Sequence, residues 1–372
     1  MISKRAQQIT ASSIRKAFVL AQSLDNPINM SIGQPDFPVP NEIKEAAQEA
    51  IKLDYNSYTL TQGIEPLRKA VAKKLRDKNQ ITQANENSVL ITSAVSGALT
   101  LALPACIDPG DEVIIFDPCF AGYRQLILLN SGVPVTVALS EDFSLNEEAL
   151  EKAINAKTKA VIFNTPGNPT GHVVSKEEIE TLAKVARKHD LIVLSDEIYE
   201  DFIYNSEKPH ISIGSIYEKT VTMSGFSKSH GMTGWRIGYA QGPAEIVEKM
   251  MEIQQYTFVC APAPLQHAAL VALKTDIKSH INRYQKNRDY LIDSLGNTYE
   301  FNPPEGAFYF FVKYPYEGEK FLNNCIKNNL LVVPGDAFSL KNTHFRLSFA
   351  TNRETIERGV VALHKINPQK SP

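Results

Sequence analysis

The stretch "AVIFNTPGNPTGHVVSKEEIETLAKVARKHDLIVLSDEIY", residues 160–199, indicates the fold most clearly. It begins with an apolar run of strand length, AVIF, and a second such run, LIVLS, lies near its end. Between them, residues 175–189 have the periodicity of an amphipathic helix. Ser175 and Glu178 have the spacing of a capping box, and the basic residues at the end of the segment suit the helix dipole. This order predicts a strand–helix–strand unit of a parallel sheet.

Apolar runs of strand length recur on both sides of this unit. They lie at residues 89–92, 112–116, 133–139 and 220–223. Buried strands that alternate with helices are typical of a doubly wound, mostly parallel sheet. In such a sheet, ligands bind beyond the carboxyl ends of the strands. We therefore predict an α/β fold with a cofactor- or nucleotide-sized site in the loops that follow the strands.

The pattern changes after about residue 245. A long helical region runs to about residue 295, and shorter strand-like pieces and a final helix after Asn352 follow it. This order predicts a smaller α+β domain. We predict a large domain over residues 30–270 and a small domain built from residues 1–29 and 271–372.

Composition and charge argue against several classes of protein. The 372 residues are 43% hydrophobic and 22% charged, as in an ordinary soluble enzyme. The formal charge is -2, so the chain lacks the basic surplus of a nucleic-acid-binding protein. Its four cysteines form no C-x-x-C pair, and its first residues contain no apolar signal region. We expect a cytoplasmic protein that binds no nucleic acid, no membrane and no metal.

Common cofactor fingerprints are absent from the sequence. No two glycines stand at positions i and i+2, so the dinucleotide motif G-x-G-x-x-G cannot occur. There is also no G-K-[ST], H-E-x-x-H or G-x-S-x-G. An NAD-linked dehydrogenase is therefore disfavoured.

Three of the loops that follow strands carry polar groups. Val95 and Ser96 begin a predicted helix whose amides can hold a phosphate, although a plain tight turn is equally consistent with this segment. Asn168 lies in a loop between two X-Pro units. Asp196 follows a buried strand and Tyr199 comes three residues later, although a salt-bridged aspartate is the commoner explanation of such a residue.

The fourth loop, "SGFSKSHGMTGWRIG" at residues 224–238, contains Lys228 and Arg236. A lysine among small and apolar neighbours is partly desolvated, which makes its amine a usable nucleophile and base. The guanidinium fork of Arg236 suits a phosphate. Pyridoxal phosphate has an aldehyde for the lysine, a ring nitrogen for a carboxylate, a phenolic oxygen for amide and hydroxyl donors, and a phosphate. The four loops together favour this cofactor.

At these residues the sequence resembles the class I/II aminotransferases, the fold-type I pyridoxal phosphate enzymes of the aspartate and aromatic amino acid type. The resemblance covers essentially the whole chain. It includes "SSIRKAF" (12–18), "SIGQPDFPVP" (31–40), "YTLTQGIEPLRKAV" (58–71), "DPCFAGY" (117–123), "NTPGNPTG" (164–171), "LSDEIYEDF" (194–202) and "FRLSFA" (345–350), besides the lysine motif.

The resemblance implies a role for each residue around the cofactor ring. Lys228 would bond the cofactor aldehyde and then move the α-proton of the substrate. Asp196 would pair with the protonated ring nitrogen. Asn168 and Tyr199 would hydrogen-bond the ring oxygen, and Phe120 would stack on the ring.

Further residues follow from the same resemblance. Val95, Ser96 and Arg236 would hold the cofactor phosphate, and Tyr58 would reach it from a second subunit. That last role implies a homodimer with shared active sites.

Substrate binding also follows from the resemblance. Arg346 would clamp the α-carboxylate of an amino acid or a 2-oxo acid, with help from Asn168 and Gly33. The implied reaction is a ping-pong transamination. Aspartate or aromatic donors and 2-oxoglutarate as acceptor are favoured, although no second cation for a side-chain carboxylate is identified.

The sequence departs from the family pattern at two positions. Gly225 stands where many members have a serine that binds the phosphate, so Ser227 or Ser224 is expected to replace it. Ala94 stands where the helix-start turn usually has glycine, which we expect to be tolerated if its φ is negative.

The resemblance leaves alternatives open. A C–S β-lyase, or other chemistry at the α-carbon, uses the same binding residues on this fold. A transcription regulator with an aminotransferase-like domain is disfavoured, because the resemblance begins within about the first fifteen residues.

Overall fold

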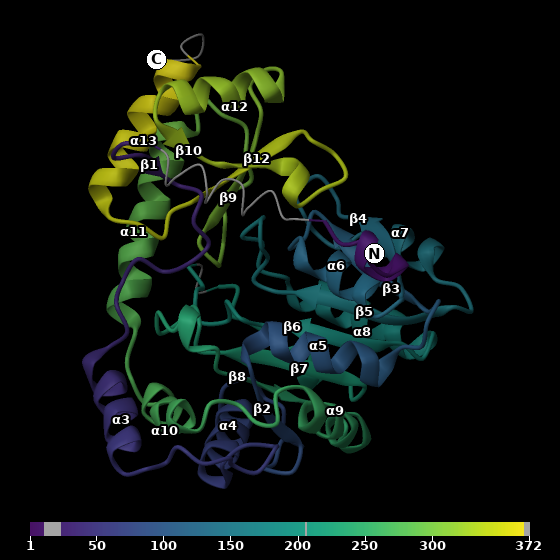
Figure 1. Cartoon of the computed structure of the whole chain (residues 1–372). Coiled ribbons are helices and arrows are strands. Elements are labelled where there is room, and N and C mark those ends of the chain that lie inside the picture. The colour runs from purple at the N-terminus through teal and green to yellow at the C-terminus, as the bar shows by residue number, and fades with distance from the viewer. Residues whose placement is uncertain (11–23, 205–206, 368–372) are drawn as a thin grey trace.

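The computed structural model describes residues 1–10, 24–204 and 207–367. Figure 1 shows a large twisted sheet with helices on both faces, and a smaller group of strands and helices above it. The sheet of the described residues has seven strands in the order β2-β8-β7-β6-β5-β3-β4. They are β2 (Val89–Thr92), β3 (Glu112–Asp117), β4 (Val133–Ala138), β5 (Thr158–Asn164), β6 (Ile192–Asp196), β7 (Thr220–Gly225) and β8 (Gly238–Gln241).

Most neighbouring strands of this sheet are parallel. β4, β3, β5, β6 and β7 pair in parallel, whereas β8 is antiparallel to both β7 and β2. The prediction of a mostly parallel, doubly wound sheet is confirmed. β8 is absent from the predicted strands, because its sequence, GYAQ, contains no apolar run.

Both faces of the sheet are buried, because successive side chains of a strand point to opposite faces. Leu194 of β6 packs in one cluster with Leu99 of α5 (Ala94–Cys106). Its neighbour Val193 packs in another cluster with Ile179 of α8 (Lys176–Lys188). The alternating burial explains why the strands read as continuous apolar runs.

The predicted start of α8 is confirmed. Ser175 Oγ accepts a hydrogen bond from the Glu178 amide at 3.2 Å, and Glu178 Oε2 accepts one from the Ser175 amide at 2.8 Å. Glu178 also accepts a hydrogen bond from the Leu145 amide at 2.8 Å and lies 3.1 Å from His172 Nε2. The capping box therefore also anchors the loop that precedes the helix.

Further helices surround the sheet. They are α3 (Asn41–Lys52), α4 (Glu65–Asp77), α6 (Gly122–Leu129), α7 (Glu147–Ala153), α9 (Ala244–Thr257) and α10 (Ala263–Ala272). The long helical region predicted after residue 245 consists of α9, α10 and α11 (Lys278–Leu295). Residues 87–107 form β2 and α5, and none of the described helices combines the length and apolarity that a membrane span requires.

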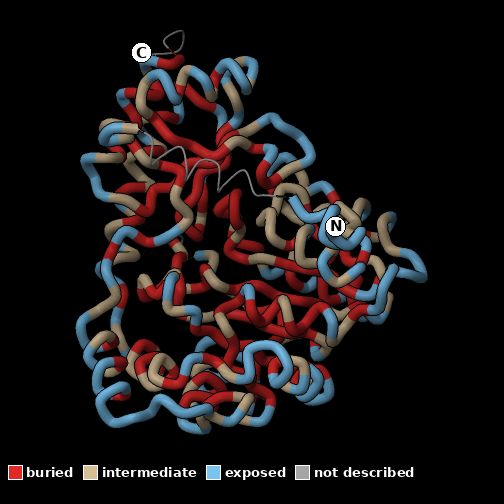
Figure 2. Tube along the Cα trace, in the orientation of Figure 1, coloured by how far each residue is buried: buried red, intermediate tan, exposed pale blue. Residues whose placement is uncertain are grey.

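The smaller group of elements has an antiparallel sheet in the order β11-β12-β9. It consists of β9 (Tyr309–Lys313), β11 (Val333–Pro334) and β12 (His344–Ser348), with α11, α12 (Gly318–Lys327) and α13 (Arg353–Ile366) beside it. Its core is strongly aromatic and includes Phe308, Phe310, Phe345 and Phe349, all fully buried. Figure 2 shows that buried residues run through both parts and through the region between them.

The N-terminal residues contact both parts of the molecule. β1 (Ile28–Asn29) pairs in parallel with β10 (Leu330–Leu331). The short helix α1 (Lys4–Gln7), in contrast, lies beside α6, and the Thr10 amide donates to Gln125 Oε1 at 3.1 Å. The division into residues 30–270 and residues 1–29 with 271–372 stays a prediction.

The capping box of α8 generates a test of stability. We expect Ser175→Ala to lower the free energy of unfolding by about 1 kcal/mol, because the amide of Glu178 loses its acceptor. Denaturant unfolding of the purified protein measures this change. Ser279→Ala, at an exposed position of α11, is the control and should leave the stability within about 0.5 kcal/mol. Equal stability of both variants would show that the cap contributes nothing.

Candidate active site

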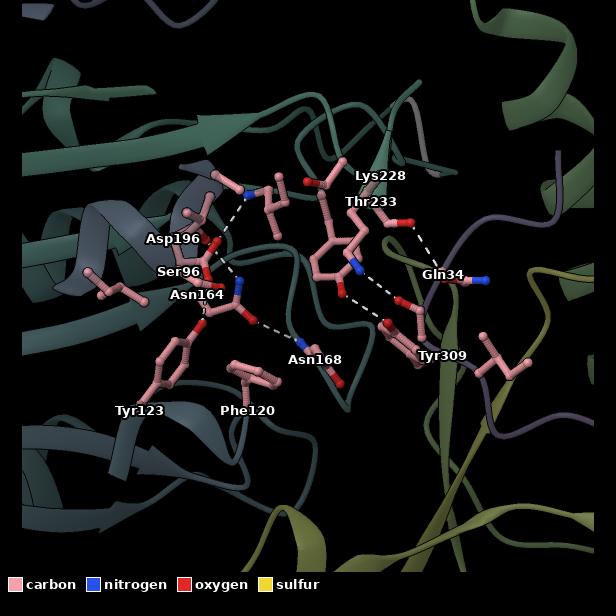
Figure 3. A pocket seen from close by; sticks show the side chains of 18 of the residues that line it. Gln34, Ser96, Phe120, Tyr123, Asn164, Asn168, Asp196, Lys228, Thr233 and Tyr309 are labelled. Carbon is pink, nitrogen blue, oxygen red and sulfur yellow. Dashed lines mark hydrogen bonds between the residues drawn. The ribbon is translucent and has the colours of Figure 1, made fainter. Parts of the chain in front are cut away.

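A cavity of about 610 Å³ lies where the carboxyl ends of the parallel strands meet the smaller sheet. Asn164 and Asp196 end β5 and β6, and Tyr309 and Arg346 reach the cavity from β9 and β12. Apart from Tyr58 and the alternative serine Ser224, the lining contains every predicted site residue, namely Gly33, Val95, Ser96, Phe120, Asn168, Asp196, Tyr199, Ser227, Lys228, Arg236 and Arg346. Figure 3 shows this cavity from close by.

Lys228 lies in the loop after β7, and its amine is held inside the cavity. Nζ donates a hydrogen bond to the Gly33 carbonyl at 2.6 Å and lies 5.9 Å from the centre of the Tyr199 ring. Desolvation and the nearby charge of Arg346 lower the pKa of Lys228 to about 8, against the opposing effect of Asp196. A substantial fraction of this lysine is therefore neutral at mildly alkaline pH, as a nucleophile requires.

Asp196 is buried at the end of β6 on the other side of the cavity (Figure 3). Its Oδ2 accepts a hydrogen bond from the Tyr123 hydroxyl at 2.7 Å, and its Oδ1 accepts one from the Ile198 amide at 3.2 Å. Burial raises the pKa of Asp196 to about 6, although these hydrogen bonds oppose the rise. The carboxylate is therefore mostly ionised at neutral pH and lacks a directly bonded cation among the described residues.

Tyr123 is a site residue that the sequence interpretation missed. It lies in the first turn of α6, and its ring makes an edge contact with Phe120 at a centroid distance of 5.4 Å. The signal for it was the spacing within "DPCFAGY", where the two aromatic residues stand three positions apart.

A chain of amides connects the ends of β5 and β6 to Arg346. Asn164 Nδ2 donates to the Asp196 carbonyl at 2.8 Å, and Asn164 Oδ1 accepts from the Asn168 amide at 2.9 Å. Asn168 Oδ1 in turn accepts a hydrogen bond from Arg346 Nη1 at 2.8 Å. Asn164 is the first residue of the predicted loop 164–171, and the sequence interpretation assigned it no role.

Arg346 is almost fully buried, at 1% exposure, and lies between two aromatic rings. Its guanidinium carbon is 4.3 Å from the Tyr309 ring centre and 4.6 Å from the Phe338 ring centre. Nη2 donates to the Ser31 carbonyl at 3.0 Å, whereas Nε is buried without a hydrogen-bond partner among the described residues. A buried guanidinium with an unused donor is suited to bind a carboxylate.

Tyr199 and Tyr309 share a hydrogen bond of 2.9 Å between their hydroxyl groups. Both rings are buried, and desolvation raises the pKa of Tyr199 well above its usual value. Tyr309 also was not predicted, because its strand gave only a packing signal. Its hydroxyl would lie 2.9 Å from a Cβ on Gly33, which explains why a glycine stands there.

The N-terminus of α5 lines the cavity opposite Lys228. Val95 and Ser96 lie in its first turn, where backbone amides have no acceptor within the helix. Ser227 Oγ is buried and has no hydrogen-bond partner among the described residues. Arg236 is exposed at the cavity edge, and its Nη1 donates to the Thr233 carbonyl at 2.9 Å. These donors together can hold a phosphate.

The two serines proposed to replace the family serine at Gly225 differ clearly. Ser224 Oγ donates to Glu200 Oε1 at 2.7 Å, and Ser224 does not line the cavity. Ser227 lines the cavity. A Cβ on Gly225 would lie 2.7 Å from the Cα of Gly238 in β8, so a serine cannot stand there unless the backbone shifts. The geometry favours Ser227.

Ala94 does not have the negative φ on which its expected tolerance depended. Its φ is +58°, in the left-handed region that favours glycine. The backbone of Gly238 runs so close to this turn that a Cβ on Gly238 would lie 2.8 Å from the Ala94 Cα. The conformation is therefore set by packing between the strand–helix turn and β8, and Ala94 tolerates it at a cost.

Tyr58 lies apart from the cavity and is 83% exposed. The structure of a single chain thus assigns it no contact with the other predicted site residues. Its predicted role requires a second subunit.

Comparison with known proteins places this geometry in context. Residues 25–363 match the family "Aminotransferase class I and II". The chain is 36% identical to a probable aspartate aminotransferase of Methanocaldococcus jannaschii, over 98% of this chain and 100% of that protein. It is also 36% identical to aromatic-amino-acid aminotransferase 2 of Thermococcus litoralis, over 99% of both chains. The structure of Thermus thermophilus aspartate aminotransferase with maleate superposes with a TM-score of 0.93 at 32% identity, over 98% of this chain and 99% of that one.

The left-handed conformation of Ala94 generates a second test. We expect Ala94→Gly to raise the free energy of unfolding by up to about 1 kcal/mol, because relief of the strain exceeds the entropy cost of glycine. Denaturant unfolding of the cofactor-free protein measures it. Ala105→Gly, in the last turn of the same helix, should instead lower stability by about 1 kcal/mol. Destabilisation by both changes would show that the turn around Ala94 is unstrained.

Proposed function

This chain belongs to the class I and II aminotransferase family, and on that basis we propose that its cavity binds pyridoxal phosphate and performs transamination between an amino acid and a 2-oxo acid. The family uses this cofactor. The observation that carries the proposal is that Lys228, Asp196 and Arg346 line one cavity, with a lysine whose pKa is lowered to about 8.

The residues of the cavity fit the cofactor. Ser227 Oγ and the first-turn amides of α5 are donors suited to its phosphate, and the guanidinium of Arg236 adds a positive charge at the cavity edge. Asp196 offers a buried anion for the ring nitrogen, and Phe120 offers an aromatic face. When bound, pyridoxal phosphate supplies an aldehyde that bonds amino groups and a ring that takes up the electron pair left by the α-proton.

Lys228 would supply both the covalent anchor and the base. Because its pKa is about 8, its amine is partly neutral near physiological pH and can bond an aldehyde. Once the substrate amine has replaced it, the freed Nζ would take the proton from the α-carbon of the substrate and deliver it to the cofactor carbon that carried the aldehyde. Its hydrogen bond to the Gly33 carbonyl keeps the amine within the cavity.

Asp196 would hold a proton on the ring nitrogen. Its pKa of about 6 leaves it ionised at neutral pH, so it can stabilise a positive charge beside it. Tyr123 and the Ile198 amide occupy its oxygens with neutral donors and leave its charge uncompensated. Asn168 and Tyr199 are proposed to hydrogen-bond the ring oxygen.

Arg346 would bind the α-carboxylate of the substrate. Its position is determined by the two aromatic rings, by Asn168 and by the Ser31 carbonyl, so little freedom is lost on binding. The unused Nε is available for a second hydrogen bond to the carboxylate. Gly33, directly beside it, gives the substrate room.

The donor is proposed to be an aromatic amino acid ahead of aspartate. Among the described residues, the only lysine and arginine side chains that line the cavity are Lys228, Arg236 and Arg346, and each already has a proposed role. An aspartate side chain would need a further cation, whereas an aromatic ring would not. The proposed acceptor 2-oxoglutarate also carries a second, side-chain carboxylate. It should therefore be tested beside a 2-oxo acid whose side chain is uncharged.

Absorbance of the reconstituted protein tests the proposed function. We expect a visible band from lysine-bound cofactor, which an aromatic amino acid alone converts to the near-ultraviolet band of the aminated cofactor. Lys228→Ala should lower turnover by about 10³-fold or more and abolish the covalent link, while the cofactor still binds. Lys69→Ala, at an exposed lysine of α4, is the control with full activity.

Other outcomes of this experiment discriminate between reactions. A visible band that persists while a 2-oxo acid and ammonia accumulate, together with sulfide from cysteine or a thiol from a thioether substrate, would assign a C–S β-lyase. If aspartate converts the visible band and aromatic amino acids do not, aspartate is the preferred donor and the proposed order is wrong. Full activity of Lys228→Ala would exclude the proposed chemistry.

The exposed apolar residues near Tyr58 support a homodimer with shared active sites. Tyr58, Leu60, Tyr256 and Phe258 are all large and exposed. The segments that carry them are joined, because Gln254 Nε2 donates to the Thr61 carbonyl at 2.7 Å. Large exposed apolar side chains on two neighbouring segments are typical of an interface. Tyr58 would then reach the phosphate of the partner's cofactor.

A hydroxyl deletion tests this role. We expect sedimentation equilibrium to show a dimer, and Tyr58→Phe to weaken cofactor binding about tenfold without changing the mass, because one hydrogen bond to a charged group is lost. Tyr55→Phe is the matched control, since Tyr55 is half exposed and stacks on His267. A monomer at micromolar concentration, or equal cofactor affinity of both variants, would contradict the shared site.

A further inference from the structure

A buried ionic network lies directly behind the turn that carries Asp196 and Tyr199. Glu197 and Glu200 each follow one of these two residues in the chain, and they are only 0% and 5% exposed. The Glu197 amide donates to the Met223 carbonyl at 2.8 Å and so continues the ladder between β6 and β7. Because side chains alternate along a strand, Glu197 lies on the face of the sheet opposite Asp196.

Each oxygen of Glu197 has two polar neighbours. Oε1 accepts hydrogen bonds from Ser195 Oγ at 2.9 Å and from Ser212 Oγ at 2.7 Å. Oε2 lies 2.8 Å from His210 Nε2 and 3.3 Å from Asn79 Nδ2. The carboxylate of Glu197, although fully buried, is thus held in one orientation.

Glu200 is held by a lysine. Lys74 Nζ lies 2.6 Å from both of its oxygens, and Ser224 Oγ and Asn79 Nδ2 donate to it at 2.7 and 2.8 Å. Lys74 also donates to the Tyr239 hydroxyl at 3.1 Å. Although desolvation opposes the effect, Lys74 lowers the pKa of Glu200 below its usual range, so both groups carry charge.

The network has the ligand types of a metal site but already contains its own cations. Glu197, Glu200 and His210 bring three ligand atoms within 4.8 Å of one another. The Lys74 ammonium, however, lies against Glu200, and His210 lies against Glu197 with its pKa raised by that carboxylate in spite of desolvation. The negative charges are therefore balanced by side chains.

The network connects distant elements to one turn. Lys74 comes from α4, Ser212 from the loop before residue 213, Ser224 from β7 and Tyr239 from β8. Buried ion pairs are weak contributors to stability compared with apolar packing. Their retention here is therefore better explained by the geometry that they impose on the turn between β6 and residue 201.

We propose that Glu197 and Glu200, together with Lys74 and His210, are positioning residues that hold Asp196 and Tyr199 for the bound cofactor. The inference rests on the proposed roles of Asp196 and Tyr199. Glu197 also places a second negative charge next to Asp196 in the chain, which favours a protonated ring nitrogen. Arg346, which would bind the substrate carboxylate, makes no hydrogen bond to the network among the described residues.

The test replaces the charge of Glu197 and preserves its shape. In the purified protein reconstituted with pyridoxal phosphate, we expect Glu197→Gln to lower kcat about tenfold. The KM for the amino acid should stay within about twofold of that of the unmodified protein. The pH midpoint of the visible cofactor band should rise by about 0.5 unit or more, because Tyr199 no longer donates optimally. Ser212→Ala, which removes one donor to Glu197, should move both quantities in the same direction by less.

The matched control is Asp201→Asn. Asp201 pairs with Lys78 on the surface and connects the end of α4 to the same turn, but it lies outside the buried network. We expect its kcat and its band midpoint to equal those of the unmodified protein. If Glu197→Gln and Ser212→Ala only lower the unfolding temperature and leave kcat and the midpoint unchanged, the network is merely structural and the inference is overturned.

The same measurement separates this inference from the proposed function. If the unmodified protein forms no visible band with pyridoxal phosphate, the proposed function fails and the inference fails with it. If the unmodified protein forms the band and converts amino acids, but both network variants match Asp201→Asn, the inference alone fails.

Discussion

A carboxylate at the end of a buried strand is the constraint on which this site depends. Burial of an ionised group is costly unless hydrogen bonds or opposite charges compensate for it. Asp196 receives only neutral donors, from Tyr123 and the Ile198 amide, and its pKa is raised to about 6. The protein thus maintains a negative charge inside a cavity and leaves a ligand cation as its natural partner. Around this group, the loops after β5, β6 and β7 gather because the carboxyl ends of parallel strands share one edge of the sheet.

Two cations on the other side of the cavity are held by one extended segment. The Ser31 carbonyl accepts from Arg346, and the Gly33 carbonyl accepts from Lys228. The segment is anchored a few residues later, where Asp36 accepts hydrogen bonds from Arg283 at 2.7 and 2.6 Å. Since α11 contributes Arg283, a helix of the smaller part helps to determine where both cations lie. Besides desolvation, the charge of Arg346 lowers the pKa of Lys228, so the group proposed to bind the substrate carboxylate also tunes the amine.

Close backbone packing shapes the end of the cavity that is proposed to hold the cofactor phosphate. β8 passes so near the strand–helix turn that neither Gly225 nor Gly238 has room for a side chain. The family serine is thereby excluded at Gly225, and Ser227 remains as the buried hydroxyl without a partner. The same close contact between β8 and the strand–helix turn involves Ala94, whose backbone is left-handed. Strain at a single residue of this kind is common where a loop must hold a ligand, because the surrounding packing overrides local preference.

The sequence by itself determined most of the helices and strands and half of the residues that line the cavity. Periodicity and capping are local, so the strand–helix–strand order of residues 160–199 and the start of α8 at Ser175 followed directly. The positions of Asp196, Asn168 and Lys228 after predicted strands also indicated that they belong to the site. Tertiary structure alone decided which distant groups hydrogen-bond these residues. Tyr123 donates to Asp196, 73 positions away in the chain, and Arg346 donates to Asn168, 178 positions away. It likewise decided the pairing of β8 and the positive φ of Ala94, because desolvation and close packing depend on neighbours in space, which no local pattern records.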